Sequence, residues 1–340
     1  MYLSYYMLDE RPFNTTPDPR FLFLTPAHRE ALAQLVYGVR ENKGFMVLTG
    51  EVGTGKTTLL RTLLQQLDAT TAVSLVLNST LPFDGLLEYM LEDFGVESAG
   101  PSRAQRLAAL NRFLIERRRA GQGAVLIIDE AQNLAPETLE QVRLLSNFET
   151  PTEKLLQILL VGQPELKFKL LLPELRQLRQ RIGLRSHIRP LFPEETRDYV
   201  RSRLNVAGAP DLALFSDRAL DRIAEYSEGI PRVINIVCDH CLLIGYGEQR
   251  RRIERDTVEQ AIEYLEEGSQ PARNRGFALD WRPDPSALRW VLGGLGAVFL
   301  GGLGALALGA GGPGPLGGAW STIFEHLSTI ARGARDLVAR

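Results

Sequence analysis

The sequence predicts an α/β fold: a parallel sheet with helices on both faces, then a small all-helical domain and a C-terminal apolar segment. Short apolar runs alternate with helix-like stretches up to residue 192, as in parallel sheets. Strand signals then vanish, and residues 290–324 contain no charged side chain. We therefore predict an α/β domain at 1–192, a helical domain at 193–268, a linker at 269–289, an apolar span at 290–309 and a tail at 310–340.

The composition is that of an ordinary globular protein. The 340 residues are 44% hydrophobic and 24% charged, and this length predicts about two domains. A net charge of −2 and a pI near 6.2 argue against a surface that coats nucleic acid. The first residues show no basic segment followed by an apolar one, so we expect no cleavable signal peptide.

The first 43 residues are expected to form an ordered lead-in to the sheet. Pro26 suits the first turn of a helix that runs to Val39. Several aromatic side chains in this region are expected to pack on the core, with the wall of a ligand pocket as the alternative; they are Phe13, Phe21, Phe23 and Tyr37.

The strongest motif is Gly-Glu-Val-Gly-Thr-Gly-Lys-Thr at residues 50–57. It lies between an apolar strand-like run at 45–49 and a helix-like stretch at 59–67, the context in which Gly-x-x-x-x-Gly-Lys-Thr binds nucleoside phosphates. Glycines let consecutive N–H groups turn towards the phosphates, and the helix adds the positive end of its dipole. The flanking elements favour this interpretation over an ordinary glycine-rich turn.

This loop predicts binding of a nucleoside phosphate with Mg²⁺. We expect Lys56 to place its charge near the β- and γ-phosphates and the Thr57 hydroxyl to ligate the Mg²⁺ ion. The predicted nucleotide-binding residues of the loop are Gly50, Glu51, Val52, Gly53, Thr54, Gly55, Lys56, Thr57 and Thr58.

After the loop helix, the pattern predicts a second buried strand at Val73–Leu77 and helices at about 83–94 and 103–119. The last helix ends in three arginines, 117–119. Basic residues are favoured at a helix C-terminus by the helix dipole. We expect a solvated helix end there, with a nucleic-acid contact as the less favoured alternative.

A third strand, at 124–128, leads directly into two acids. Ala-Val-Leu-Ile-Ile is fully apolar, as in a buried parallel strand, and Asp129 and Glu130 follow at its carboxyl end. Because the loop lies at the same sheet edge, both carboxylates should face the phosphates. We expect Asp129 to hold Mg²⁺ through its water shell and Glu130 to polarise the attacking water.

A helix at 136–148 precedes a fourth strand at 155–161, and Gln163 lies just beyond its end. A polar side chain there is expected to touch the γ-phosphate or the water, with a turn role as the alternative. Helical residues 165–181 and a last strand at 186–191 complete the predicted sheet domain.

The helical domain should contain four helices, at about 194–206, 217–227, 231–246 and 254–267. Cys238 and Cys241 lie within the third, in an apolar helical run. We expect buried, reduced core cysteines, since a metal site needs further ligands at suitable spacing.

The segment 290–309 is long enough to cross a bilayer as a helix, and its glycines permit close helix contacts. The alternative is a flexible Gly/Ala tail. Several arginines precede it, which places the N-terminal side in the cytoplasm of a single-pass inner-membrane protein. Residues 320–340 can form an amphipathic helix that lies on a membrane or binds a partner.

Taken together, the motifs resemble the AAA+ ATPases of the general secretion pathway protein A family. The resemblance covers about residues 1–268. It rests on the phosphate-binding loop and on the strand-end acids in Val-Leu-Ile-Ile-Asp129-Glu130-Ala-Gln. Five further stretches carry it: Leu-Leu-Val-Gly-Gln163-Pro-Glu-Leu, Gly-Ile-Pro-Arg232, Pro-Asp18-Pro-Arg-Phe-Leu-Phe-Leu, His28-Arg-Glu-Ala-Leu and Leu178-Arg-Gln-Arg-Ile182.

The resemblance implies a homo-oligomer with ATP at subunit interfaces. It implies that Gln163 is sensor 1 and that Arg232 is the sensor 2 arginine of the helical lid. Arg179 or Arg181 would be the arginine finger inserted into a neighbour's site; we prefer Arg181, with a surface ion pair as the alternative. Tyr37 and Gly38 lie where the family contacts adenine.

The resemblance also implies a role in an envelope secretion, polysaccharide export or pilus system. Members with a membrane span often continue into a periplasmic peptidoglycan-binding domain. Only 31 residues follow Gly309, so we do not expect a cell-wall role. Two alternatives stay open: a cytosolic, DNA-associated transposition-type ATPase, and a nucleotide-gated scaffold with little turnover.

Overall fold

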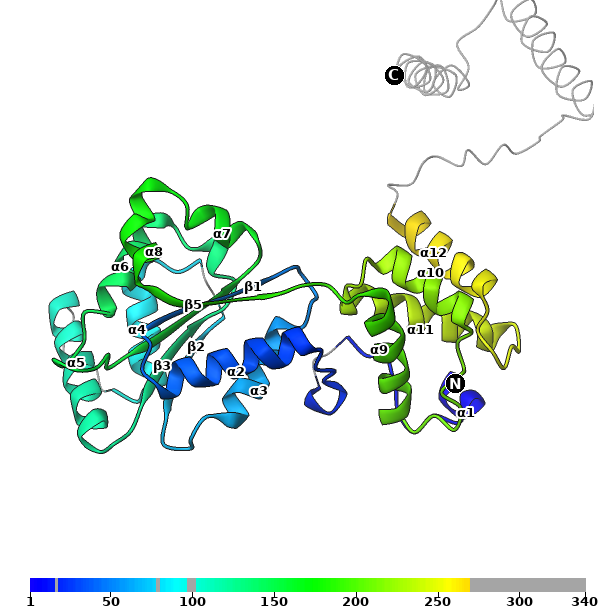
Figure 1. Cartoon of the computed structure of the whole chain (residues 1–340), viewed down its shortest axis with the longest axis horizontal. Helices are drawn as coiled ribbons and strands as arrows, with labels where there is room; N and C mark the ends of the chain where they lie inside the picture. Colours follow the sequence, from blue (N-terminus) through cyan, green and yellow to red (C-terminus); the bar gives the residue numbers. More distant parts are fainter. Residues whose placement is uncertain (16–17, 78–79, 97–101, 270–340) are drawn as a thin grey trace, which may run out of the picture. The chain divides into compact units, whose positions relative to one another are not determined.

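The computed structural model describes residues 1–15, 18–77, 80–96 and 102–269 (Figure 1). The predicted apolar span at 290–309 and the tail at 310–340 lie outside these residues, as does almost all of the predicted linker. Among the helices of the described ranges, none combines the length and the apolar character needed to cross a bilayer.

Within the part of the chain that the structure describes, five parallel strands form one sheet in the order β2-β3-β4-β1-β5. This confirms the predicted parallel α/β fold. The strands are β1 (Phe45–Gly50), β2 (Ala72–Val76), β3 (Ala124–Ile128), β4 (Gln157–Gly162) and β5 (Ile182–Ile188).

Helices cover both faces of the sheet, as predicted (Figure 1). Along β3, Leu126 packs with one layer of helices and Ile127 with the other, which explains the unbroken apolar run. One layer contains α2 (Pro26–Arg40) and α3 (Lys56–Gln66). The other contains α4 (Phe83–Asp93), α5 (Arg103–Arg119), α6 (Pro136–Leu145), α7 (Glu165–Lys169) and α8 (Arg176–Arg181).

The helical part contains α9 (Pro193–Val206), α10 (Asp217–Ser227), α11 (Pro231–Gly247) and α12 (Arg255–Ser269). All four start and end within a few residues of the predicted bounds. Cys238 and Cys241 are buried in this core, where burial raises the pKa of both thiols. Elsewhere in the described residues, three short 3₁₀ turns occur: η1 (Pro19–Phe21), η2 (Ala131–Asn133) and η3 (Pro173–Leu175).

The lead-in packs with the helical part as well as with the sheet. Tyr2 and Tyr6 of α1 (Tyr2–Tyr6), with Phe13 and Phe21, belong to the same core cluster as α9–α12. Tyr2 donates a hydrogen bond to Asp239 of α11 at 2.6 Å. Residues 1–270 accordingly group as one compact unit.

One strand differs from the prediction. We expected the last strand at 186–191, but β5 spans Ile182–Ile188. It lies at the sheet edge beside β1, and Gly183, Arg185 and His187 along it are exposed. Because its first residues alternate between exposed and half-buried, they lack the continuous apolar run of a central strand.

Candidate functional site

Three parallel strands bring the predicted functional residues to one edge of the sheet. Thr49 at the end of β1 lies opposite Gly162 of β4, and Ile128 of β3 lies opposite Leu160 of β4. The residues that follow these strand ends are the glycine-rich loop, the two acids and Gln163. The carboxyl edge of a parallel sheet is where such folds bind ligands.

Lys56, the first residue of α3, is folded back over the loop. Its side chain is buried, and Nζ donates to the carbonyls of Gly50 at 2.8 Å and Glu51 at 3.0 Å. Burial lowers the pKa of the Lys56 ammonium, while the nearby carboxylates of Glu130 and Asp129 act in the opposite direction. The charge is therefore held inside the loop by backbone oxygens and acids.

Asp129 is 7% exposed, and its Oδ1 accepts a hydrogen bond from the Glu130 backbone N–H at 2.9 Å. Burial raises the pKa of its carboxyl group. A divalent cation favours the ionised carboxylate and would oppose this effect. Thr57 is exposed and lines the cavity. The oxygen donors of Thr57 and Asp129 fit a hard cation such as Mg²⁺.

Glu130 adopts a left-handed backbone conformation, with φ 50° and ψ 38°. Its Oε2 accepts hydrogen bonds from the side-chain amides of Gln132 at 2.5 Å and Gln163 at 3.0 Å. Burial alone would raise the pKa of Glu130, but these two bonds and the charge of Lys56 hold it below its ordinary value. The sequence predicts no role for Gln132, because nothing in the pattern shows which way its side chain points.

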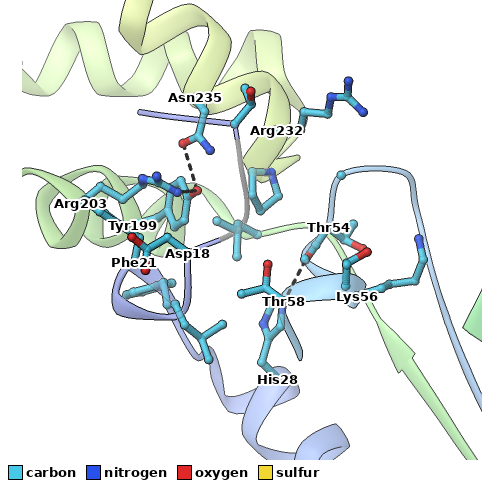
Figure 2. A pocket seen from close by; sticks show the side chains of 18 of the residues that line it. Asp18, Phe21, His28, Thr54, Lys56, Thr58, Tyr199, Arg203, Arg232 and Asn235 are labelled. Carbon is cyan, nitrogen blue, oxygen red and sulfur yellow. Dashed lines mark hydrogen bonds between the residues drawn. The ribbon is translucent and has the colours of Figure 1, made fainter. Parts of the chain in front are cut away.

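A cavity of about 400 Å³ extends from the loop towards the helical part (Figure 2). Its volume falls within the range of small-molecule sites. Glu130 lines it, together with residues of the loop, the lead-in and two helices. These residues include His28, Phe21, Tyr199, Arg203, Arg232 and Asn235.

The far wall of the cavity is aromatic and centred on a buried arginine. The guanidinium carbon (Cζ) of Arg203 in α9 lies 4.7 Å from the centroid of the Phe21 ring. The same guanidinium donates a hydrogen bond to the Tyr199 hydroxyl at 2.9 Å. Tyr199 in turn donates to Asn235 at 3.0 Å (Figure 2). Arg203 also donates to the carbonyls of Pro12 and Asn14, which ties the lead-in to the wall. Of these residues, the sequence singled out only Phe21.

Comparisons with known proteins agree with this geometry. A family model described as an AAA domain matches residues 39–170. General secretion pathway protein A of Aeromonas hydrophila is 43% identical over 254 residues, covering 74% of this chain and 46% of the relative. The chain belongs to the general secretion pathway protein A family of AAA+ ATPases. It spans less than half the length of this relative.

Solved structures of more distant proteins share the fold. Cdc6p from Pyrobaculum aerophilum matches with a TM-score of 0.58 at 20% identity, covering 76% of this chain and 71% of that one. The ORC2 protein of Aeropyrum pernix matches with a TM-score of 0.56 at 17% identity, covering 76% of this chain and 72% of that one. At these identities, the likeness concerns the fold alone.

The family's expected lid residue lies beside the loop. The Arg232 N–H donates to the Gly53 carbonyl at 3.2 Å, and a Cβ on Gly53 would lie 2.6 Å from that of Arg232. The first turn of α11 therefore packs directly on the glycine-rich loop. The Arg232 side chain is exposed and extends away from Tyr199 and Asn235 (Figure 2).

The other family positions lie apart from the cavity. Arg181 donates to Ser146 Oγ at 2.5 Å and to Asn147 Oδ1 at 2.7 Å, near the end of α6. Arg179 donates to the Leu171 carbonyl at 3.4 Å. Both lie outside the set of residues that line the cavity of their own chain.

The two residues expected beside adenine are also outside this set. Tyr37 is 51% exposed, with the Lys43 ammonium 5.2 Å from its ring centroid. Gly38 packs against Met46 and Leu184. A Cβ added to Gly38 would lie 2.3 Å from Met46 Sδ and 2.7 Å from Leu184 Cδ1, which is too close. The structure therefore does not bring Tyr37 and Gly38 together with the loop.

Arg203→Met should destabilise the fold and loosen the lead-in, because the carbonyls of Pro12 and Asn14 lose a buried cationic donor. We expect a loss of about 2–4 kcal/mol in the free energy of unfolding, measured by urea titration. Arg201→Met is the matched control on the same helix. Its ion pair with Asp217 is exposed, so its cost should stay below about 0.5 kcal/mol. Equal unfolding midpoints for the two variants would contradict the claim that the Arg203 bonds to the lead-in stabilise the fold.

Proposed function

We propose that this protein hydrolyses ATP with Mg²⁺ at the carboxyl edge of its sheet. One observation carries the proposal: Lys56 and Glu130 line the same cavity, and both Glu130 and Asp129, the residues directly after β3, lie within electrostatic reach of Lys56. The family supports ATPase activity in general. The exact reaction is our proposal.

Each residue has a distinct part in this reaction. Lys56 exchanges its bonds to the loop carbonyls for the β- and γ-phosphate oxygens. Mg²⁺, held by Thr57 and by Asp129, neutralises phosphate charge when bound. Glu130 accepts a hydrogen bond from the attacking water, and Gln163 holds Glu130 or the γ-phosphate in position.

The aromatic wall is the proposed base pocket. Phe21 and Tyr199 provide apolar ring surface, and Asn235 provides an amide near the same wall. Such surfaces bury a base while a few polar groups orient it. The pocket thus replaces Tyr37 and Gly38 as the proposed site for adenine.

We also propose that the active form is a homo-oligomer with an arginine supplied in trans. Arg181 is exposed and separate from its own cavity, as a residue that serves a neighbouring subunit must be. To reach that neighbour it would have to exchange its bonds to Ser146 and Asn147 for a phosphate. Arg179 is the alternative donor.

The proposed setting is the bacterial inner membrane, with the ATPase part in the cytoplasm and one span at 290–309. The length of that segment, its lack of charge and the arginines before it support the anchor. The named role of the Aeromonas relative supports a secretion or export system as the partner, with polysaccharide or pilus assembly as related settings. The likeness to Cdc6p and ORC2 concerns the fold, and the net charge of −2 disfavours a DNA partner.

Lys56→Ala should weaken ATP binding about 10- to 100-fold, because the charge-assisted bonds to phosphate are lost. Glu130→Gln should bind ATP normally and lower phosphate release at least about 100-fold. Fluorescent-nucleotide titration and a phosphate-release assay measure the two effects. Glu137→Gln, an exposed acid on α6, is the matched control. Turnover by Glu130→Gln equal to that of the parent would refute its role and favour a nucleotide-gated scaffold.

Arg181→Ala should bind ATP but hydrolyse it about 10³-fold more slowly. Mixing it with Lys56→Ala should restore part of the activity, because one subunit then keeps the loop and the other keeps the arginine. Arg176→Ala, exposed on the same helix, serves as the control. If Arg179→Ala shows this behaviour and Arg181→Ala does not, Arg179 is the finger; if mixing restores nothing in either case, the arginine does not act in trans.

Membrane fractionation of the full chain against residues 1–270 tests the anchor. The shorter chain retains α12 complete and the whole compact unit. We expect the full chain to need detergent and the shorter chain to stay in the soluble fraction with its ATPase activity. Recovery of both chains in the soluble fraction would remove the membrane from the proposal.

A further inference from the structure

His28 is a buried titratable residue that the proposed reaction does not use. It lies in the first turn of α2, is 4% exposed, and faces the glycine-rich loop (Figure 2). Its Nε2 lies 3.1 Å from the Thr54 carbonyl oxygen, and its Nδ1 lies 2.7 Å from Thr25 Oγ1. One imidazole ring thus joins the N-cap of α2 to the loop.

The hydrogen-bond partners define the tautomer of this ring. A carbonyl oxygen can only accept, so Nε2 carries the proton and donates to Thr54. In the neutral ring, Nδ1 then accepts from the Thr25 hydroxyl, whose oxygen also caps α2 by accepting the His28 backbone N–H at 3.2 Å. Burial lowers the pKa of His28, which agrees with a neutral ring at pH 7.

The Thr54–Gly55 peptide is the part of the loop that needs an external restraint. Gly55 has φ +98°, a conformation open to glycine, and it precedes the first residue of α3. With glycine on one side, rotation of this peptide plane meets little steric resistance. In a planar trans peptide, the C=O and N–H bonds point in opposite directions, so fixing one fixes the other.

We propose that His28 is a positioning residue: its bond to the Thr54 carbonyl holds the Thr54–Gly55 peptide so that the Gly55 N–H faces the nucleotide phosphates. The neighbouring carbonyl, that of Gly53, is held in the same manner by the Arg232 N–H of α11. Two successive loop carbonyls are thus bonded by two separate helices. The proposal rests on the proposed nucleotide binding at this loop.

Three substitutions of His28 distinguish the contribution of the Nε2 hydrogen bond from that of the Nδ1 hydrogen bond. A glutamine amide reaches about as far as Nε2, so His28→Gln can still donate to the Thr54 carbonyl. An asparagine amide reaches only about as far as Nδ1, so His28→Asn can still meet Thr25 but not the loop. His28→Phe fills the ring volume and has neither bond.

Binding of ATP, ADP and GTP to the full chain and to each variant, measured by titration calorimetry, tests the proposal. His28→Phe and His28→Asn should weaken ATP and ADP binding about tenfold, and His28→Gln should stay within about twofold of the parent. The preference for ATP over GTP should not change, because the peptide contacts phosphate and not the base. If His28→Phe fails to fold, the difference in nucleotide affinity between His28→Gln and His28→Asn still tests whether the bond to Thr54 matters.

Several results would overturn the proposal that His28 positions the loop peptide. Parent-like affinity in both His28→Phe and His28→Asn would remove His28 from phosphate binding. A change in the ATP-to-GTP preference would show that His28 contacts the base instead. Absence of nucleotide binding in the parent chain would reject the proposed function itself, which distinguishes that failure from a failure at His28.

Discussion

The glycine-rich loop can present N–H groups to phosphates only while its carbonyl oxygens have partners elsewhere, since a carbonyl facing a phosphate would repel it. The loop itself and two helices supply these partners. The Thr54 hydroxyl donates to the carbonyl of Glu51 at 2.8 Å, the Arg232 N–H of α11 donates to that of Gly53, and His28 of α2 donates to that of Thr54. The loop conformation therefore depends on the helical part and on the first turn of α2 together.

The lead-in is the element that connects these parts. Its aromatic side chains pack in the core of the helical part, and Arg203 bonds the carbonyls of Pro12 and Asn14. A few residues later the same segment becomes α2, whose first turn meets the loop through His28. A displacement of the helical part would thus reach the loop along two routes that each end in a hydrogen bond. One runs through residues 22–28 to the His28 bond with Thr54, and the other through residues 230–232 to the Arg232 bond with Gly53.

The sequence predicted what depends on short-range pattern. Central strands are apolar on both faces, and the loop and acids follow directly from strand ends, so their arrangement was predictable. The edge strand β5 was misplaced because its early residues are partly exposed. His28, Gln132 and Arg203 bond partners that tertiary packing supplies, from 26 to 191 residues away in the chain, and periodicity carries no signal for such pairs.

The two adjacent acids differ because their environments differ. Burial raises the pKa of Asp129, whereas the amides of Gln132 and Gln163 and the charge of Lys56 outweigh burial at Glu130 and lower its pKa. Neighbouring carboxyl groups with pKa values moved apart are typical of divided roles in catalysis. A carboxylate with a lowered pKa is a weak proton acceptor. Two side-chain amides therefore hold the Glu130 carboxylate in its ionised form, in an orientation suited to polarising a water molecule.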